Sequence, residues 1–269
     1  MRLHLSFLGA IAFTASALAA PVEKRSSSGW NDYSCKPSAA HPRPLILVHG
    51  LFGNGGPYWD YMAPRLANQG YCVFSLSYGG NGLFGGTGPI EDSARELSSF
   101  VDNVLSTTGK SQVDMVGHSE GGLMPRYYIK NLGGASKVNI FIGLAPVGHG
   151  TTLDGLGTLA SKVGFLNALT VDICPACAEM IVGSSFLTTL DAGGDTVPGP
   201  TYITLVTKYD EAVTPYTSGE LNGAANYVLQ NFCGLDFTEH IGITSDERAL
   251  HFVKNQLDPA NATPVNCFG

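Results

Sequence analysis

The feature that most constrains the fold is the pentapeptide Gly117-His118-Ser119-Glu120-Gly121, which matches the pattern Gly-x-Ser-x-Gly. The run 112–116 before it predicts a short buried strand, and the run 122–131 after it predicts a helix. A serine on so sharp a turn is held with its hydroxyl clear of the sheet, and flanking glycines let strand and helix approach closely. Because the pattern alone also occurs by chance in glycine-rich chains, the strand–turn–helix context carries this interpretation.

Five further runs read as strands, and helical patterns alternate with them. The expected strands are 45–48, 71–76, 137–144, 201–207 and 226–233, and the expected helices include 58–69 and one that Pro89 opens and Gly109 follows. About six strands alternating with helices predict an α/β fold with a mostly parallel sheet covered on both faces. We see no internal repeat and no linker, so one domain is expected.

Three local expectations concern helix ends and interiors. Pro125 lies inside the helix after the serine, where it should remove one backbone hydrogen bond and kink the first turns. Ser245 should cap the last helix, with Asp246 and Glu247 in its first turn. Residues 149–200 are too long for a plain connection and are rich in apolar side chains, so we expect short helices forming a cap over the site.

The N-terminus predicts export from the cell. Residues 1–20 have the apolar run and small-residue end of a signal peptide, 21–25 end in a dibasic pair typical of a processing site, and 26–269 form the expected domain. Lys24 and Arg25 would otherwise be an ordinary exposed pair. The net charge is −7 and becomes more negative on removal of residues 1–25, which argues against nucleic-acid or anionic-lipid partners.

The cysteines fit an oxidising compartment. An even number of them follows the processing site, and six cysteines allow many pairings. We predict Cys35–Cys72, Cys174–Cys177 as a staple of the cap, and Cys233–Cys267 as a link between the C-terminal tail and the loop before His240. Half a zinc site at Cys174 and Cys177 is the alternative, but no second Cys-x-x-Cys or suitable His pair accompanies it.

The serine needs an imidazole base and a carboxylate that orients the base. In chain order after Ser119, His240 lies in a loop beyond the last strand, and Asp210 lies just past a strand end. The histidines rejected for the base are His118, His149 and His251. The rival acids, which lack the strand-end position or crowd the histidine loop, are Glu211, Asp191, Asp195 and Asp236.

Two loops are candidates for holding the substrate. The expected donors to a developing oxyanion are the backbone amides of Leu51, which stands between Gly50 and Gly53, and of Glu120. The alternative for the loop of Leu51 is an ordinary turn between a strand and a helix, without a catalytic role. A glycine-rich loop carries Leu83 and Phe84, which either line the substrate or fold back on the core. The residues expected to hold an acyl chain are Leu83, Phe84, Phe165, Leu166 and Leu169.

These residues resemble a known family. The stretch Gly117–Tyr128, with His49–Gly53 and Tyr209–Pro215, is similar to secreted triacylglycerol lipases and esterases of the α/β-hydrolase fold. The stretch from Cys233 to His240 also resembles the same part of a yeast secreted lipase B. The resemblance implies acyl-ester hydrolysis without a cofactor or metal. It departs at Glu120, where such enzymes often carry Gln, and a carboxylate there would alter pH dependence or substrate polarity.

The sequence therefore predicts a secreted serine lipase that acts on medium or long acyl esters. The alternatives are an esterase or cutinase-like enzyme on small or polymeric esters and, from another class, a non-catalytic relative that kept the fold. The expected partners are a lipid or ester substrate and an oil–water interface, with no nucleic acid, no transmembrane segment and a monomeric state. Asn261 opens the only glycosylation sequon, in a tail expected to be exposed.

Overall fold

The computed structural model describes residues 30–80, 84–162, 164 and 173–268, so the expected signal peptide and processing site lie outside the described residues. Six parallel strands form one sheet in the order β2-β1-β3-β4-β5-β6. The strands are β1 (Leu45–Val48), β2 (Val73–Ser75), β3 (Val113–His118), β4 (Val138–Leu144), β5 (Thr201–Val206) and β6 (Ala225–Val228). This is the expected α/β architecture, and every pairing between these strands is parallel.

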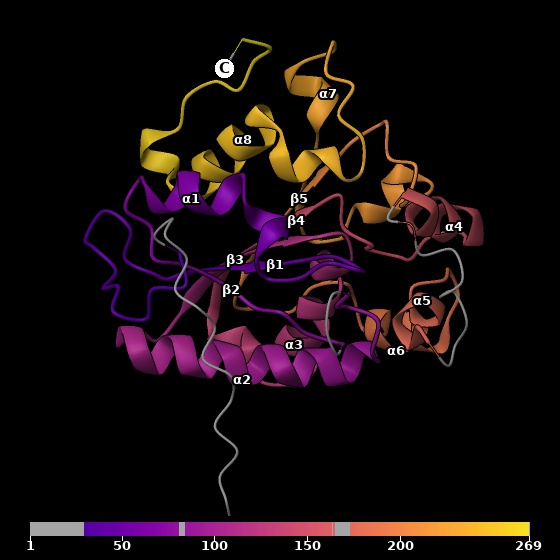
Figure 1. Cartoon of the computed structure of the whole chain (residues 1–269), viewed down its shortest axis with the longest axis horizontal. Helices are drawn as coiled ribbons and strands as arrows, with labels where there is room; N and C mark the ends of the chain where they lie inside the picture. The colour runs from indigo at the N-terminus through magenta and orange to yellow at the C-terminus, as the bar shows by residue number, and fades with distance from the viewer. Residues whose placement is uncertain (1–29, 81–83, 163, 165–172, 269) are drawn as a thin grey trace, which may run out of the picture.

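The sheet separates two hydrophobic layers. Alternate side chains of β1 enter opposite layers: Leu45 and Leu47 pack on one face, and Ile46 and Val48 on the other. All four are fully buried, as expected for a strand covered on both faces. Figure 1 shows α1 (Met62–Ala67) and α8 (Glu247–Leu257) on one face and α2 (Ile90–Thr108) and α3 (Met124–Asn131) on the other.

The remaining helices are short. They are α4 (Leu153–Lys162), α5 (Pro175–Glu179), α6 (Ser185–Asp191) and α7 (Leu229–Phe232). The 3-10 turns are η1 (Pro57–Trp59), η2 (Ser119–Gly122), η3 (Gly134–Ser136), η5 (Tyr216–Gly219), η6 (Gly242–Ser245) and η7 (Pro259–Asn261). The helix expected over 58–69 is thus one 3-10 turn followed by α1.

The expectation that Pro125 lies inside a helix and removes one of its hydrogen bonds is wrong. The chain leaves Ser119 as the 3-10 turn η2, so α3 begins only at Met124 and Pro125 stands in its first turn. The first amides of a helix have no partner within it, so a proline there removes no hydrogen bond.

Two other boundaries also differ from expectation. The expected strand 226–233 ends at Val228, and the rest of it forms α7, whose Leu229 is buried beneath the sheet edge. The last helix is capped by Asp246 rather than Ser245, because the Asp246 carboxylate accepts the amide of Ala249 at 2.8 Å. Aspartate and serine both suit this position, and the chain reaches α8 one residue later than expected.

The three expected disulfides are confirmed in the structure. They join Cys35 to Cys72, Cys174 to Cys177 and Cys233 to Cys267. In the part of the chain that the structure describes, no helix is both long and apolar enough to cross a membrane.

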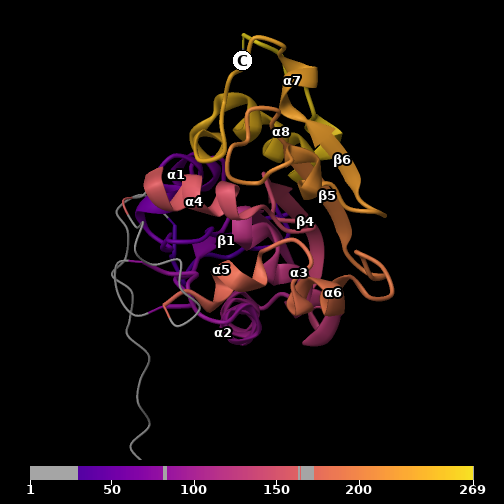
Figure 2. The same ribbon diagram turned by 90° about the vertical axis from the view of Figure 1, so that its right-hand side faces the viewer.

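The segment 149–200 forms α4, α5 and α6, which gather at one end of the sheet (Figures 1 and 2). The side chains of α5 and α6, including Met180, Phe186 and Leu190, join the core layer of α2 and α3. The Glu179 carboxylate also accepts the first amide of α2, at Ile90, at 2.7 Å. Leu156, Leu159 and Ala160 of α4 join the same layer, so all three helices pack on the body of the fold. A cap over the site formed by residues 149–200 stays a prediction.

Candidate active site

Ser119 stands on a sharp turn between β3 and η2 with φ of +57°, a backbone region that costs energy for any residue other than glycine. The neighbouring glycines make the turn possible. A Cβ on Gly117 would lie 1.7 Å from the Gly121 carbonyl oxygen, and one on Gly121 would lie 2.2 Å from that of Val48. The close approach of strand and turn expected from the sequence is therefore present.

Ser119, His240 and Asp210 form one continuous chain of hydrogen-bonding groups. The Ser119 Oγ lies 2.9 Å from His240 Nε2, and His240 Nδ1 lies 2.9 Å from Asp210 Oδ2. The side chains of His240 and Asp210 are 0% and 2% exposed, so water does not compete for these contacts. The three residues come from loops after β3, β5 and β6, which end at the same edge of the parallel sheet.

The Asp210 carboxylate is oriented by its own loop. Its Oδ1 accepts the amides of Ala212 and Val213 at 3.0 and 2.7 Å, which leaves Oδ2 facing the imidazole. These two bonds fix the orientation of the carboxylate.

The residues rejected from the sequence have other partners. Among the acids, Asp236 pairs with Arg248 at 2.6 Å, while Asp191 pairs with Arg126 at 2.7 Å. Among the histidines, His251 lies on α8, and its Nε2 contacts the Thr263 hydroxyl at 2.8 Å.

The loop after β1 lies directly against the candidate nucleophile. A Cβ on Gly50 would lie 2.8 Å from the Ser119 Cβ, so only glycine lets this backbone come so close. The register of β1 and β3 pairs Val48 with Gly117, so the residues that follow these two strands lie side by side. Leu51 follows Gly50 and is buried, and the role of its amide as an oxyanion donor stays a prediction.

His118, rejected as the base, instead supports it. Its Nε2 donates to the backbone carbonyl of His240 at 2.8 Å, and its Nδ1 contacts the Tyr58 hydroxyl in a very short hydrogen bond. Burial, together with the neighbouring His240, lowers the pKa of His118 well below its usual value, so the ring is neutral. The motif shows that His118 is adjacent to Ser119, but no local pattern points to Tyr58, which lies 60 residues away.

A second buried imidazole lies in the loop after β1. His49 stacks on Tyr78 with ring centroids 4.2 Å apart, and its Nδ1 lies 2.8 Å from the Gly50 carbonyl. Burial lowers its pKa to about 4, although the Gly50 carbonyl acts in the opposite direction. His49 is therefore uncharged near neutral pH, and it stiffens the loop that carries Leu51.

Glu120 is the departure from the family pattern, and its side chain is wholly buried. Neither carboxyl oxygen has a hydrogen-bond partner within the described residues. A Cβ on Gly86 would lie 2.5 Å from Glu120 Oε2 and 3.2 Å from the Leu51 Cα, so the carboxyl lies beneath the loop at Gly86. Burial, and then repulsion from Glu179, raises the pKa of Glu120 well above 4.5. The group is therefore held as a neutral acid, which is close in shape to glutamine.

We expect Glu120→Gln to stabilise the protein increasingly as the pH rises. The pKa of Glu120 is raised in the folded state, so above its usual 4.5 the unfolded chain releases a proton that the folded chain keeps. Stability is therefore lost with rising pH, at about 1.4 kcal/mol per unit, until the pH passes the folded-state pKa. Glutamine removes this dependence. Urea unfolding of both proteins across pH 5 to 8 measures the gain.

The control for this measurement is Glu91→Gln, which changes an exposed carboxylate in the first turn of α2. It should not reproduce the widening difference. Stability curves of wild type and Glu120→Gln that run parallel across the pH range would contradict a neutral Glu120.

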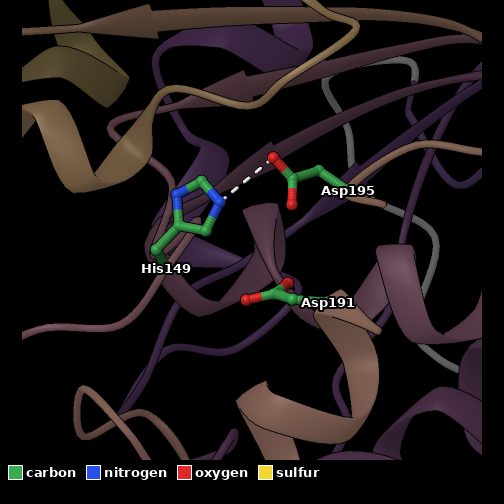
Figure 3. A group of neighbouring side chains, drawn as sticks. All are labelled: His149, Asp191 and Asp195. Carbon is green, nitrogen blue, oxygen red and sulfur yellow. Dashed lines mark hydrogen bonds and ion pairs between the residues drawn. The ribbon is translucent and has the colours of Figure 1, made fainter. Parts of the chain in front are cut away.

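A separate group of possible metal ligands lies beside α3. Figure 3 shows His149 directed at Asp195, with Asp191 opposite, and their ligand atoms lie within 4.8 Å of one another. The buried Arg126 guanidinium approaches Asp191 at 2.7 Å and Asp195 at 3.8 Å. Asn222 donates both its backbone and side-chain N–H groups to Asp195 Oδ2. Because a cation already neutralises these carboxylates, we interpret the group as an ion-pair network that ties α3 to residues 191–195.

Most of the residues expected to bind an acyl chain lie outside the described residues: Leu83, Phe165, Leu166 and Leu169. Phe84 is described and 37% exposed, and the next amide, that of Gly85, donates to the Gly53 carbonyl at 2.8 Å. Its loop therefore lies against the loop after β1.

Large exposed apolar side chains lie in the loops of Asp210 and His240, a feature that was not predicted from the sequence. Tyr209, Leu235 and Phe237 are 42%, 78% and 66% exposed. The rings of Tyr209 and Phe237 lie 5.2 Å apart, and Tyr209 directly precedes Asp210. Isolated exposed apolar residues give no pattern in the sequence, so only the fold reveals that Tyr209 and Phe237 lie together.

Solved structures of similar fold include lipase B of Aspergillus fumigatus, with a TM-score of 0.68 at 19% identity over 87% of this chain and 55% of that chain. Another is the mature form of the Bacillus licheniformis lipase BlEst2, with a TM-score of 0.61 at 20% identity over 82% of this chain and 94% of that one. At such identities the likeness shows the α/β-hydrolase fold alone.

At the level of sequence, a triacylglycerol lipase of Pseudarthrobacter phenanthrenivorans is 36% identical over 94 residues, which is 33% of this chain and 28% of that protein. The match thus spans less than a third of the relative's length. The model of the family described as "Lipase (class 2)" matches residues 42–250, which include Ser119, Asp210 and His240. Because this match covers most of the chain, the chain belongs to the class 2 lipases.

Proposed function

We propose that this protein hydrolyses carboxylic esters of long acyl chains, triacylglycerols among them, through an acyl-enzyme on Ser119. The observation that carries the proposal is the chain from Ser119 through His240 to Asp210, with both links at 2.9 Å. An isolated serine hydroxyl is a weak nucleophile, and this arrangement is what activates it.

In the proposed reaction, His240 Nε2 takes the proton of Ser119 as Oγ attacks the ester carbonyl. Asp210 accepts a hydrogen bond from Nδ1–H, so that Nε2 is the basic nitrogen and the imidazolium is stabilised. The amides of Leu51 and Glu120 stabilise the oxyanion. His240 then protonates the departing alcohol, and a water that it activates cleaves the acyl-enzyme. His118 donates to the backbone carbonyl of His240 and Glu211 accepts its backbone amide, and both bonds keep the ring in place.

The surroundings of the proposed triad support the binding of an acyl chain and of an oil–water interface. The loops that hold Asp210 and His240 expose the large apolar side chains of Tyr209, Leu235 and Phe237. Transfer of one such side chain out of water is worth about 1.5–3 kcal/mol, so a few of them suffice to hold a lipid surface.

We expect the rate to rise with acyl length. For p-nitrophenyl esters from acetate to laurate, kcat/KM should increase because each buried methylene adds about 0.8 kcal/mol of binding. An emulsified triacylglycerol should also be hydrolysed. A rate that falls steadily beyond acetate, with no release of fatty acid from the emulsion, would instead indicate an esterase of small esters.

We further propose that the protein acts outside the cell as a monomer and that Asn261 is open to glycosylation. The three disulfides favour an oxidising compartment. Asn261 lies exposed in η7 near the C-terminal end of the described chain.

A further inference from the structure

One lysine joins α4 to both loops that carry the triad partners of Ser119. Lys162 is the last residue of α4, and its Nζ lies 2.5 Å from Glu211 Oε1 and 3.0 Å from Glu239 Oε2. Glu211 follows Asp210 in the chain, and Glu239 precedes His240. A single ammonium group therefore bridges the neighbour of the acid and the neighbour of the base.

The two carboxylates hold the backbone on either side of the catalytic imidazole. Glu211 Oε2 accepts the amide of His240 at 3.3 Å. Glu239 accepts the amides of Ile241 and Gly242 at 3.0 and 2.9 Å. The peptide groups before and after the His240 ring are thus fixed by two like charges that share one counter-charge.

The opposite end of α4 is attached to the same region by neutral contacts. The Thr151 hydroxyl donates to the Ala212 carbonyl at 2.6 Å and accepts the amide of Thr214 at 3.0 Å. A Cβ on Gly155 would lie 2.3 Å from that carbonyl, so the helix lies directly on the loop after Asp210. Lys162 completes this attachment and extends it to the His240 loop.

The contacts of Lys162 and of Glu239 shift the pKa of each toward its charged form. The pKa of Lys162 is raised, and the main cause is the hydrogen bond between Lys162 and Glu211. Burial acts to raise the pKa of Glu239. Hydrogen bonds with Lys162, the Ile241 amide, the Glu211 side chain and the Gly242 amide outweigh burial and lower that pKa. All three side chains are between 27% and 39% exposed, so dissolved salt reaches the bridge.

We propose that Lys162 is a positioning residue, an ionic latch that holds α4 on the loops of Asp210 and His240 and thereby aligns the imidazole with Ser119. The inference rests on the proposed function. Without Lys162, Glu211 and Glu239 repel each other, and the amide contacts that fix His240 loosen. The alignment of a general base affects turnover more than substrate affinity, because it matters only as the proton moves.

The test measures kcat and KM on p-nitrophenyl butyrate for wild type, Lys162→Gln and Lys162→Arg. Lys162→Gln should lower kcat roughly three- to tenfold with little change in KM, and Lys162→Arg should restore most of it. Raising NaCl to 1 M should bring the wild type toward the Gln variant, because it shortens the screening length to about 3 Å. The matched control is Lys137→Gln, which removes a surface ion pair with Asp102 at 2.5 Å in another part of the fold.

A double-mutant cycle with Glu239→Gln separates the latch from a general loss of stability. Glu239 accepts the amides of Ile241 and Gly242 with separate oxygens, and glutamine keeps only one acceptor oxygen, so Glu239→Gln alone also loses one of these bonds. The coupling between the two substitutions excludes that separate loss and isolates the charge pair. The latch predicts that the double variant is scarcely worse than either single one. It is overturned if the losses simply multiply, if Lys162→Gln matches Lys137→Gln, or if arginine does not rescue. A wild type that cleaves no ester would overturn the proposed function itself, before any variant is compared.

Discussion

Replacing Ser119 with alanine should abolish ester hydrolysis, with a loss in kcat on the order of 10⁴- to 10⁶-fold. No other side chain of the described part supplies a nucleophile at the turn between β3 and η2, so His240 would have no hydroxyl to activate. Loss of the serine of such a triad costs about as much as loss of the whole triad, because its members act as a unit. What remains is the contribution of substrate binding and the oxyanion donors.

The fold should survive this substitution, because the change removes only one hydroxyl group and alanine introduces no steric clash. The measurement is the initial rate on p-nitrophenyl butyrate, together with a thermal unfolding curve. Ser99→Ala is the matched control, since that serine is exposed on α2 and bonds only its own helix, at the Arg95 carbonyl. A Ser119→Ala enzyme that works at near wild-type rate would rule out Ser119 as the nucleophile.

Replacing His240 with alanine should lower kcat by about 10⁴-fold or more. Its Nε2 is the only basic atom shown in contact with the Ser119 hydroxyl within the described residues, and its ring is fully buried. Asp210→Asn should be comparably damaging, because an amide in place of Oδ2 can favour the wrong imidazole tautomer.

The control for the base is His251→Ala. His251 lies on α8 and contacts Thr263 near the C-terminus, so its loss should leave turnover within a factor of about two. An inactive His251→Ala beside an active His240→Ala would show that the base is misassigned.

The proposed triad could be predicted from the sequence because its chemistry depends on local patterns. The glycines at positions 117 and 121 stand where a Cβ would strike backbone, and this requirement is written in the motif itself. His240 and Asp210 followed from chain order and from their places after strands, and the structure brings both to Ser119.

The supporting contacts could not be read in this way, since they join residues far apart in the chain. Tyr58 reaches His118 across 60 residues, and Lys162 reaches Glu239 across 77. The misplaced boundaries have a different origin. The apolar run after Asn226 suits a strand or a helix equally, and packing against α8 decides in favour of a short helix there.

The most direct test of the central claim is covalent labelling with an alkyl p-nitrophenyl phosphonate, which mimics the tetrahedral intermediate and needs an activated serine. We predict that one phosphonyl group adds to each wild-type molecule, with release of one p-nitrophenolate, and that peptide mapping places it on Ser119. Ser119→Ala should take up none. Labelling at another residue, or an unlabelled wild type that still cleaves esters, would contradict an acyl-enzyme on Ser119.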